Sequence, residues 1–368
     1  MPHRILYVIG ALGTGGAERQ LLELTAGLDR RRYEPLVCAL DVGHEYAAAF
    51  AERGVPVVEF PRRGSLDWQR LTALRSRIRS EQPALIHAFL ASPALYARLA
   101  CIGLRSRPPV IVSERTVLPR PAYVRVADWL LAHRSACFLA NADAVRESLL
   151  DAVWPQQPRV EVIPNGFDLS PFERGPTRTE LRARLGWGEE TIALCVGRLT
   201  DAKDFPTLLD AFAKLDRPNL RLVIAGEGEK RSEIEQRIRS QDLRVTLLGL
   251  RTDVPDLLRA ADLFVLASKV EGFPNVIGEA LAAGLPVAAT SAGGVPEVVR
   301  AGVDGCVVPI GDSSALADAV EFLLDDPTLA REMASRGATR VREEFSLEAM
   351  IDRTQAVYSE LLAEPSRR

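Results

Sequence analysis

Short apolar runs alternate with helix-like repeats along almost the whole chain. The first half contains buried-strand patterns at residues 4–10, 34–40, 55–60, 84–89, 109–114 and 160–164, and the second half at 191–197, 220–226, 244–249, 262–268, 285–290 and 305–309. Between them lie segments with apolar residues spaced three and four apart, such as 17–28 and 68–80. Apolar strands separated by helices are typical of parallel sheets covered on both faces. The pattern predicts an α/β fold made of two doubly wound, Rossmann-like domains.

The periodicity weakens at residues 164–176, which contain three prolines and two glycines. We interpret this stretch as the joint between an N-terminal domain, residues 1–164, and a C-terminal domain, residues 165–345. Beyond Asp312 the pattern is helical to the end. The closing amphipathic segment, residues 346–368, is predicted to cross back onto the first domain.

Composition narrows the functional classes. The 368 residues include 46 Lys+Arg and 49 Asp+Glu, and 26 % are charged, which excludes disordered, collagen-like and coiled-coil classes. The near-neutral balance also argues against a nucleic-acid partner. The charges are unevenly distributed, since residues 1–165 hold 21 arginines, no lysine and 16 acidic residues, for a net charge of +5. The two halves are therefore expected to face different partners.

Cysteine usage and hydropathy indicate the compartment. The five cysteines are scattered without disulfide or metal-binding spacing, and we expect them to be reduced packing residues. We expect no leader peptide, and the longest uncharged stretch, 280–296, is interrupted by Gly284 and Pro286. The chain has only 4 histidines, so no metal site is predicted. The sequence predicts a cytoplasmic protein that is able to touch a membrane surface.

Ligands of open parallel sheets bind at the carboxyl ends of the strands, so two such domains should face each other across a cleft. The first strand runs into a glycine-rich loop at residues 10–19. Such a loop lets backbone N–H groups and a helix N-terminus approach a phosphate. A dinucleotide-binding loop with Asp41 on the ribose is an alternative, but its third glycine would fall on Glu18. A tight turn without a ligand is the other alternative.

Arg198 and Lys203 follow the strand at 191–197. A guanidinium and an ammonium group at this edge can both reach a diphosphate. The lysine is notable because the chain has 42 arginines and 4 lysines. The alternative is a solvated pair of loop residues.

Glu271 and Glu279 flank the predicted start of a helix near Pro274. The backbone N–H groups of residues 273–276 would form an anion site there. Carboxylates accept hydrogen bonds from hydroxyl groups, so two acids around one phosphate site suit a nucleotide sugar, with hexose, diphosphate and ribose in a row. The alternative is one acid favoured by the helix dipole and one surface glutamate.

Six motifs in this order resemble the family 4 glycosyltransferases. They are GGAERQ (15–20), VIPNG (162–166), GRLTDAK (197–203), AGEG (225–228), EGFPNVIGEALAAGLPV (271–287) and ATSAGGVPE (289–297). The resemblance covers nearly the whole chain. It implies the two-domain GT-B fold, a nucleotide-diphosphate sugar donor, retention of the anomeric configuration and no required metal cofactor. UDP-sugars are favoured as donors, with GDP-sugars as the other possibility.

The resemblance also implies a donor site. Gly15 and Gly16 would contact the donor phosphates, Arg198 and Lys203 the pyrophosphate, Glu271 the transferred sugar and Glu279 the ribose. The backbone groups of Phe273, Pro274, Asn275 and Val276 would hold the phosphate and the sugar hydroxyls.

Three residues of the first half complete the implied site. His87, at the end of a strand, would lie beside the donor sugar and position it; with Arg198, Lys203 and Glu271 it forms the expected catalytic set. Taken by itself, a lone strand histidine is more typical of packing. Many family members carry His-x-His, whereas here the second position is Phe89. Glu114 and Arg115 would lie near the acceptor.

The predicted function is transfer of a sugar to a glycan or lipid-linked acceptor, in the synthesis of cell-surface polysaccharide or glycolipid. A nucleotide-sugar epimerase or a phosphorylase on the same fold is one alternative, and a non-catalytic nucleotide-sugar binding module is another.

Two basic amphipathic segments of the first half bear on the acceptor. Residues 67–80 place Trp68, Leu71, Leu74 and Ile78 on one face, and residues 120–134 do so with Tyr123, Val126, Ala127, Leu130 and Leu131. Both fit ordinary core-facing helices. The alternative is a surface that collects anionic lipid or a lipid-linked acceptor.

Overall fold

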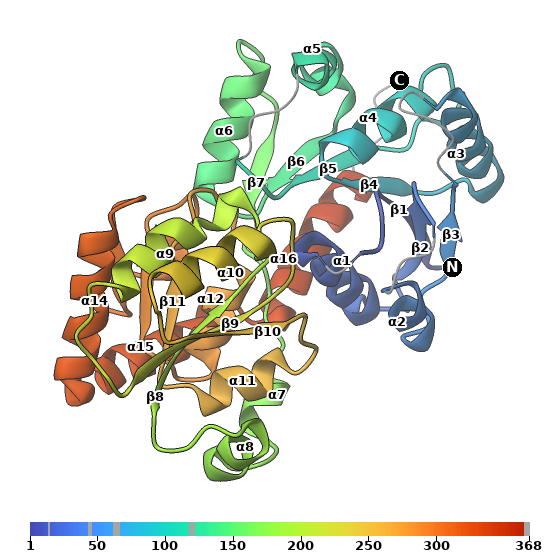
Figure 1. The fold of residues 1–368 in the computed structure, drawn as a ribbon. Helices are drawn as coiled ribbons and strands as arrows, with labels where there is room; N and C mark the ends of the chain where they lie inside the picture. Colours follow the sequence, from blue (N-terminus) through green and yellow to red (C-terminus); the bar gives the residue numbers. More distant parts are fainter. Residues whose placement is uncertain (14, 43–45, 62–66, 118–121, 364–368) are drawn as a thin grey trace. The chain divides into compact units, whose positions relative to one another are not determined.

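The computed structural model describes residues 1–13, 15–42, 46–61, 67–117 and 122–363. The chain divides into two compact units: unit 1 comprises Met1–Gly166 and Leu347–Arg368, and unit 2 comprises Phe167–Ser346. Of the closing segment 346–368, residues 364–368 lie outside the described part. Each unit is a parallel sheet with helices on both faces (Figure 1).

Within the described ranges, unit 1 contains a seven-stranded sheet in the order β3-β2-β1-β4-β5-β6-β7. Its strands are β1 (His3–Ile9), β2 (Tyr33–Ala39), β3 (Val57–Glu59), β4 (Leu85–Phe89), β5 (Val110–Glu114), β6 (Cys137–Ala140) and β7 (Val160–Val162). Its helices are α1 (Gly16–Gly27), α2 (Tyr46–Glu52), α3 (Trp68–Glu81), α4 (Ala91–Ala100), α5 (Ala122–Leu131), the short 3-10 helix η1 (Ala132–Arg134), α6 (Asp143–Val153) and α16 (Leu347–Ala363).

Unit 2 contains a six-stranded sheet, again counted over the described residues, in the order β10-β9-β8-β11-β12-β13. Its strands are β8 (Thr191–Val196), β9 (Leu220–Ala225), β10 (Val245–Gly249), β11 (Leu263–Leu266), β12 (Val287–Thr290) and β13 (Cys306–Val308). Its helices are α7 (Ser170–Glu173), α8 (Arg178–Leu185), the 3-10 helix η2 (Asp201–Lys203), α9 (Phe205–Phe212), α10 (Arg231–Ser240), α11 (Val254–Ala260), α12 (Asn275–Ala282), α13 (Val295–Val298), α14 (Ser313–Asp325) and α15 (Pro327–Glu344).

The α/β prediction is confirmed, with one strand missed. The apolar pattern predicts six strands in the first half. The structure contains a further strand, β6, which is formed by CFLA at Cys137–Ala140 and lies between β5 and β7. This run has only four residues and directly follows the short helix η1, so its apolar pattern is too brief to stand out. The strand carries Asn141 at its carboxyl end.

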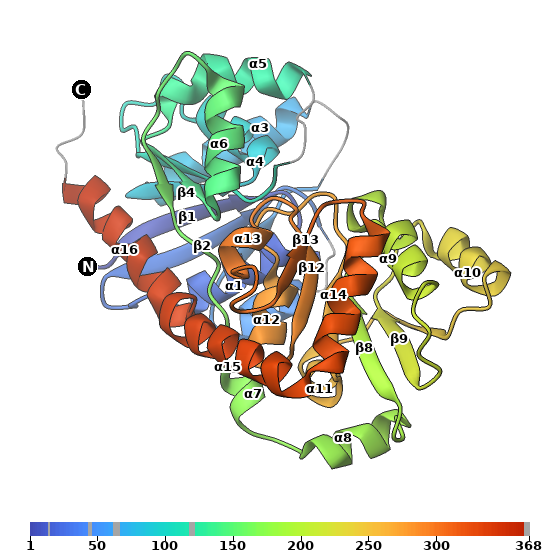
Figure 2. The same ribbon diagram turned by 90° about the vertical axis from the view of Figure 1, so that its left-hand side faces the viewer.

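Alternation along the strands of unit 1 separates two apolar cores. Side chains of Ile5, Tyr7 and Ile9 pack with α1 and α16, whereas Leu6 and Val8 pack with α3 and α4. Figure 2 shows α16 and α1 on one side of this sheet and α3, α4 and α6 on the other. The same alternation along β4 and β5 decides which of their side chains point toward α16.

Both sheets reverse their strand order at one point. In unit 1 the reversal lies between the adjacent strands β1 and β4, and in unit 2 between β8 and β11. Loops diverge there in opposite directions, so open α/β sheets bind ligands at the carboxyl ends of these strands. The predicted donor-site residues of unit 2 follow β8 and β11, and Gly15 and Gly16 follow β1, whereas His87 lies inside β4. Across the described ranges, no helix has the length and apolar character needed to span a membrane.

Candidate functional site

The loop after β8 carries the two predicted cations, and a neighbouring glycine loop fixes its backbone. A Cβ on Gly226 would lie 1.9 Å from the carbonyl oxygen of Gly197, so only glycine allows this approach. The N–H of Leu199 donates to the carbonyl of Glu227 at 2.9 Å. The AGEG motif thus supports the strand end from which the exposed side chain of Arg198 projects.

Lys203 and Glu271 are separated by 68 residues and form an ion pair. Lys203 Nζ lies 2.5 Å from Glu271 Oε1, and the two side chains are only 19 % and 11 % exposed. The hydroxyl of Ser268 donates to the same oxygen at 2.6 Å. The pair forms because β8 and β11 are neighbours in the sheet. Two residues with separate predicted roles, Lys203 on the pyrophosphate and Glu271 on the sugar, are therefore in direct contact.

The loop after β12 supports Glu271 from its other side. Gly293 has a φ of +50°, and a Cβ there would lie 1.8 Å from the carbonyl oxygen of Glu271. The hydroxyl of Thr290 donates to the carbonyl of Ser268 at 2.6 Å. The ATSAGGVPE motif therefore packs against the backbone of the segment that carries Glu271, at Ser268 and at Glu271 itself.

The start of α12 presents backbone rather than side chains. The ring of Phe273 is 6 % exposed and packs against Phe167 and Phe345, with ring centroids 6.1 and 5.4 Å apart. Pro274, which was expected to be the first helical residue, is the N-cap, so α12 begins one residue later, at Asn275. The N–H groups of a first helical turn have no acceptor within the helix, so this end suits an anion.

Asn275, Val276 and Glu279 occupy the first two turns of α12. Asn275 and Val276 are partly exposed, whereas Glu279 is 6 % exposed. The predicted contact of Glu279 with a ribose stays a prediction.

The glycine loop after β1 forms the N-terminus of α1. Gly15 is the N-cap and Gly16 the first helical residue. The carboxylate of Glu18 lies against this end of the helix. It is so close that a Cβ on Gly15 would be 2.1 Å from Glu18 Oε2. An acidic group at a helix N-terminus is favoured by the dipole. Thr14 lies outside the described residues.

His87 is buried in the core that contains α16. It is 1 % exposed, and its ring nitrogens lie 2.6 Å from the hydroxyl of Tyr358 and 2.7 Å from that of Ser113. The hydroxyls of Tyr358 and Tyr7 are 3.0 Å apart, which extends the network to β1. A neutral imidazole donates from one nitrogen and accepts at the other, so both of its positions are satisfied.

The protonation state of His87 follows from this environment. Burial, together with the positive charge of Arg115, lowers the pKa of His87 well below its ordinary value of 6.5. The ring is therefore neutral at pH 7. A neutral, fully bonded histidine is suited to holding neighbouring groups in place rather than to taking up a proton.

We expect His87 to make the stability of the fold pH-dependent. Below pH 6.5 the unfolded chain protonates this histidine while the folded protein resists it, so the free energy of unfolding should fall as the pH falls. One such group contributes up to ~1.4 kcal/mol per pH unit. Denaturant titrations at pH 7.5 and 5.5 measure the difference. His87→Gln should lose this component, and equal pH slopes for the two proteins would contradict the assignment.

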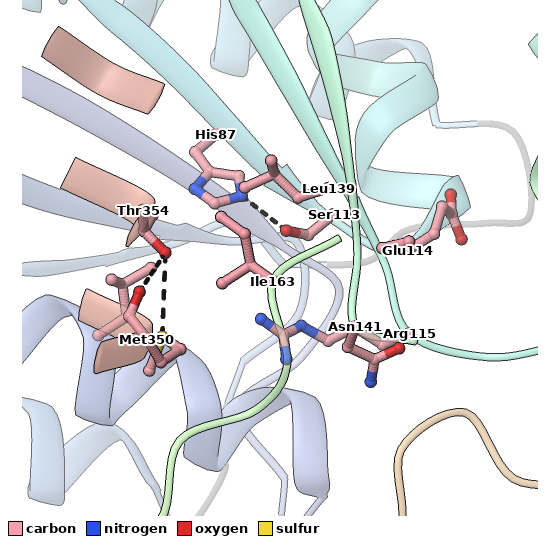
Figure 3. Close-up of a pocket in the computed structure, with 11 residues that line it drawn as sticks. His87, Ser113, Glu114, Arg115, Leu139, Asn141, Ile163, Met350 and Thr354 are labelled. Atoms are coloured by element: carbon pink, nitrogen blue, oxygen red, sulfur yellow. Dashed lines mark hydrogen bonds between the residues drawn. The ribbon is translucent and has the colours of Figure 1, made fainter. Parts of the chain in front are cut away.

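A small pocket adjoins His87 in unit 1 and is drawn in Figure 3. Its lining includes Ser113, Glu114 and Arg115 from the end of β5, and Asn141 from the end of β6. Successive strand residues point to opposite faces, so Ser113 points to His87 while Glu114 points away from it (Figure 3). Glu114 is 1 % exposed. Its predicted place near the acceptor stays a prediction.

The VIPNG motif is contacted by Arg115 and by Gln20 of the GGAERQ motif. The guanidinium of Arg115 lies 4.9 Å from the ring centroid of Phe89 and donates to Asn165 of the VIPNG motif. Gln20 of the GGAERQ motif exchanges two hydrogen bonds with the backbone of Gly166, at 2.8 and 3.1 Å. Burial lowers the pKa of Arg115 to about 10, so the group stays charged at pH 7.

Sequence reasoning missed the groups that support the predicted residues. Tyr358 and Ser268 are ordinary polar positions in their segments, and the ATSAGGVPE motif contains Thr290 without indicating what its hydroxyl contacts. The amphipathic closing segment was the available signal for a helix that packs on unit 1, but it does not single out Tyr358.

Two family models match the chain. Residues 14–171 match Glycosyltransferase Family 4, and residues 177–340 match Glycosyl transferases group 1.

Curated relatives and solved structures extend these matches. The alpha-D-kanosaminyltransferase of Streptomyces kanamyceticus is 30 % identical over 327 residues, covering 81 % of this chain and 82 % of the relative. A second relative is an alpha-1,4-N-acetyl-D-galactosaminyltransferase of Campylobacter jejuni, whose name specifies a PP-undecaprenol-linked saccharide. It is 27 % identical, and the match covers 92 % of this chain and 94 % of the relative. The structure of HepE from Anabaena in complex with UDP and glucose has a TM-score of 0.88 and 26 % identity, covering 97 % of this chain and 100 % of that one.

Proposed function

Because this chain belongs to glycosyltransferase family 4, we propose that it transfers a sugar from a nucleotide-diphosphate donor to a glycan or lipid-linked acceptor and retains the anomeric configuration. The chain is a glycosyltransferase whose two α/β units have the GT-B architecture. The observation that carries the proposal is the Lys203–Glu271 pair at the strand-order reversal of unit 2.

Unit 2 is the proposed donor unit. Lys203 and Arg198 follow β8, and the N-terminus of α12 follows β11, so a cation pair and a helix end are available to one diphosphate. On donor binding, Lys203 would exchange the carboxylate of Glu271 for phosphate oxygens. Glu271 would then be released to accept hydrogen bonds from sugar hydroxyls. UDP-sugars are the favoured donors, supported by HepE structures that contain UDP or UDP-glucose.

The proposed chemistry is charge stabilisation. Cleavage of the anomeric C–O bond builds positive charge on the sugar and negative charge on the leaving diphosphate. Lys203, Arg198 and the first-turn N–H groups of α12 would stabilise the diphosphate, and preorganised groups of this kind usually supply the largest catalytic contribution. The acceptor hydroxyl would attack on the face that the diphosphate leaves, and a diphosphate oxygen would take its proton.

Unit 1 is the proposed acceptor unit. Neutral His87 would position the donor sugar without acting as a base, and Gly15 and Gly16 would add backbone contacts to the donor phosphates. Glu114 and Arg115 would lie near the acceptor. The lipid-linked saccharide in the name of the Campylobacter relative supports an acceptor of that class. The net charge of +5 over residues 1–165 suits a cytoplasmic enzyme that works at an anionic membrane surface.

A thermal-shift screen and a donor-hydrolysis assay test the function together. UDP-, GDP- and ADP-sugars are added separately to the full chain, and we expect the UDP-sugars to raise the melting temperature most. Slow release of UDP without an acceptor would establish catalysis. Stabilisation without any nucleotide release, with or without acceptor glycans, would indicate a binding module instead, and no stabilisation by any of them would contradict the donor site.

A further inference from the structure

Helix α5 of unit 1 presents an apolar face to the outside. Val126, Trp129 and Leu130 are 57 %, 43 % and 53 % exposed. Their spacing of i, i+3 and i+4 places them on one side of the helix. Both views show α5 at the outer border of the layer that contains α4 and α6 (Figures 1 and 2). The inward side of α5 holds the buried Val124 and the half-buried Ala127 and Leu131, so this helix is apolar on its outward side as well as its inward side, unlike an ordinary surface helix.

The inward side of α5 is partly ionic. Asp128 is 1 % exposed and pairs with Arg98 of α4, which is fully buried. A buried ion pair contributes little net stability, but its geometry fixes which side of a helix can face inward. The pair therefore keeps Asp128 inward, with Val126, Trp129 and Leu130 on the outward side of α5.

A second exposed aromatic residue lies beside α5. The side chain of Gln156 donates to the carbonyl of Trp129, which places the segment after α6 next to the end of α5. Trp154 in that segment is 69 % exposed. We call Val126, Trp129, Leu130 and Trp154 together the α5 surface. Tryptophan is enriched where proteins meet the interface between lipid and water.

The surroundings of the α5 surface are positively charged. Residues 67–134 contain 11 arginines, no lysine and 4 acidic residues, and three of these acids, Asp67, Glu114 and Asp128, are buried. Arg125 and Arg134 are exposed on α5 and η1, and Arg105 and Arg107 are exposed in the segment after α4, whereas the neighbouring helix α6 carries the exposed acids Asp143, Glu147 and Asp151. An apolar face amid basic groups is complementary to anionic lipid.

The structure distinguishes the two basic segments, and α3 follows the core-facing interpretation. Leu74 and Ile78 of α3 are 0 % and 3 % exposed, so the apolar side of that segment faces the core and only Trp68 remains on the surface. In the second segment the side chain of Tyr123 lies outside the described part, whereas Val126 and Leu130 are exposed. A membrane contact can therefore involve α5 but not the stripe of α3.

We propose that the α5 surface inserts into the interface of a membrane that contains anionic lipids, with the surrounding arginines paired to lipid phosphates. This inference rests on the proposed function for its purpose, since it would bring a lipid-linked acceptor to unit 1. A second copy of the chain fits the surface less well, because a symmetric contact would bring two positively charged regions together.

Vesicle sedimentation tests the proposal with the full chain. We expect the native protein to bind vesicles of phosphatidylcholine with about 30 % phosphatidylglycerol, and to bind pure phosphatidylcholine at least ~10-fold more weakly. The triple variant Val126→Ser/Trp129→Ser/Leu130→Ser should bind the anionic vesicles at least ~10-fold more weakly than the native protein. The matched control Leu250→Ser/Phe322→Ser changes exposed apolar residues of unit 2, 64 % and 47 % exposed, and should bind normally.

Three further measurements make the outcomes distinct. Tryptophan emission should shift to the blue on anionic vesicles and be quenched by brominated acyl chains. UDP-sugar hydrolysis without vesicles should be equal in the native protein and the triple variant. Absence of hydrolysis in both proteins would count against the proposed function and not against the α5 surface. Native-like vesicle binding by the triple variant would overturn the proposal. So would absence of binding by the native protein, or a native dimer that the triple variant converts to monomer.

Discussion

Replacing Lys203 by alanine is expected to lower turnover by ~10²–10³-fold while leaving the fold intact, because loss of one preorganised charge-stabilising donor typically has this effect. The ammonium group is only 19 % exposed and is positioned by Glu271. Water cannot replace it at the same place and with the same charge. Glu271→Ala is also expected to reduce turnover severely, since it removes both the proposed sugar contact and the group that holds Lys203.

The measurement is release of UDP from a UDP-sugar with saturating acceptor, together with circular dichroism of each variant. Lys214→Ala is the matched control, because Lys214 lies in the same unit and its ammonium group donates to the hydroxyls of Ser313 and Ser314 on the surface. Turnover of Lys203→Ala within ~3-fold of the native protein would contradict the donor-site assignment.

Gly293→Ala is expected to reduce turnover by ~10²-fold through geometry alone, without removing any functional group. The added Cβ would lie 1.8 Å from the carbonyl oxygen of Glu271, so the two loops must separate. A displacement of about 1 Å in a catalytic group can cost this much. The left-handed backbone at φ +50° adds a stability cost of ~1–2 kcal/mol for any residue with a Cβ.

Gly302→Ala separates these two effects. Gly302 has a φ of +73°, and a Cβ there would meet nothing within 4 Å. This variant should lose ~1–2 kcal/mol of unfolding free energy and keep its turnover. The comparison uses denaturant titration and UDP release for both variants. Equal turnover of Gly293→Ala and Gly302→Ala would show that the close approach does not position Glu271.

Much of the fold was predictable because buried parallel strands have a recognisable local sequence pattern. A strand such as 4–10 is buried on both faces and is therefore apolar throughout, and the helices between strands carry their own periodicity. The strand β6 escaped because four residues give too short a pattern. The candidate residues Arg198, Lys203 and Glu271 could also be found from the sequence, since each follows a predicted strand, whereas His87 was expected at a strand end and lies inside β4.

Contacts between distant segments could not be predicted in this way. Nothing near Lys203 in the sequence indicates that it pairs with a glutamate 68 residues later, because that pairing depends on β8 and β11 being adjacent. The same holds for His87 and Tyr358, which are 271 residues apart and meet because alternation in β4 turns the imidazole toward α16.

The sequence by itself determined the α/β class, the motifs of the family and the residue types available for phosphate and hydroxyl binding, because these depend on local pattern and composition. Tertiary structure decided which of these groups touch, how far each is exposed, and which sides of α3 and α5 face outward. The physical reason is that burial and pairing are set by neighbours from other segments. The basic helices of the first half illustrate this: similar apolar stripes were expected in both, yet α3 buries Leu74 and Ile78, whereas Val126 and Leu130 of α5 are exposed and the Arg98–Asp128 pair occupies the inward side.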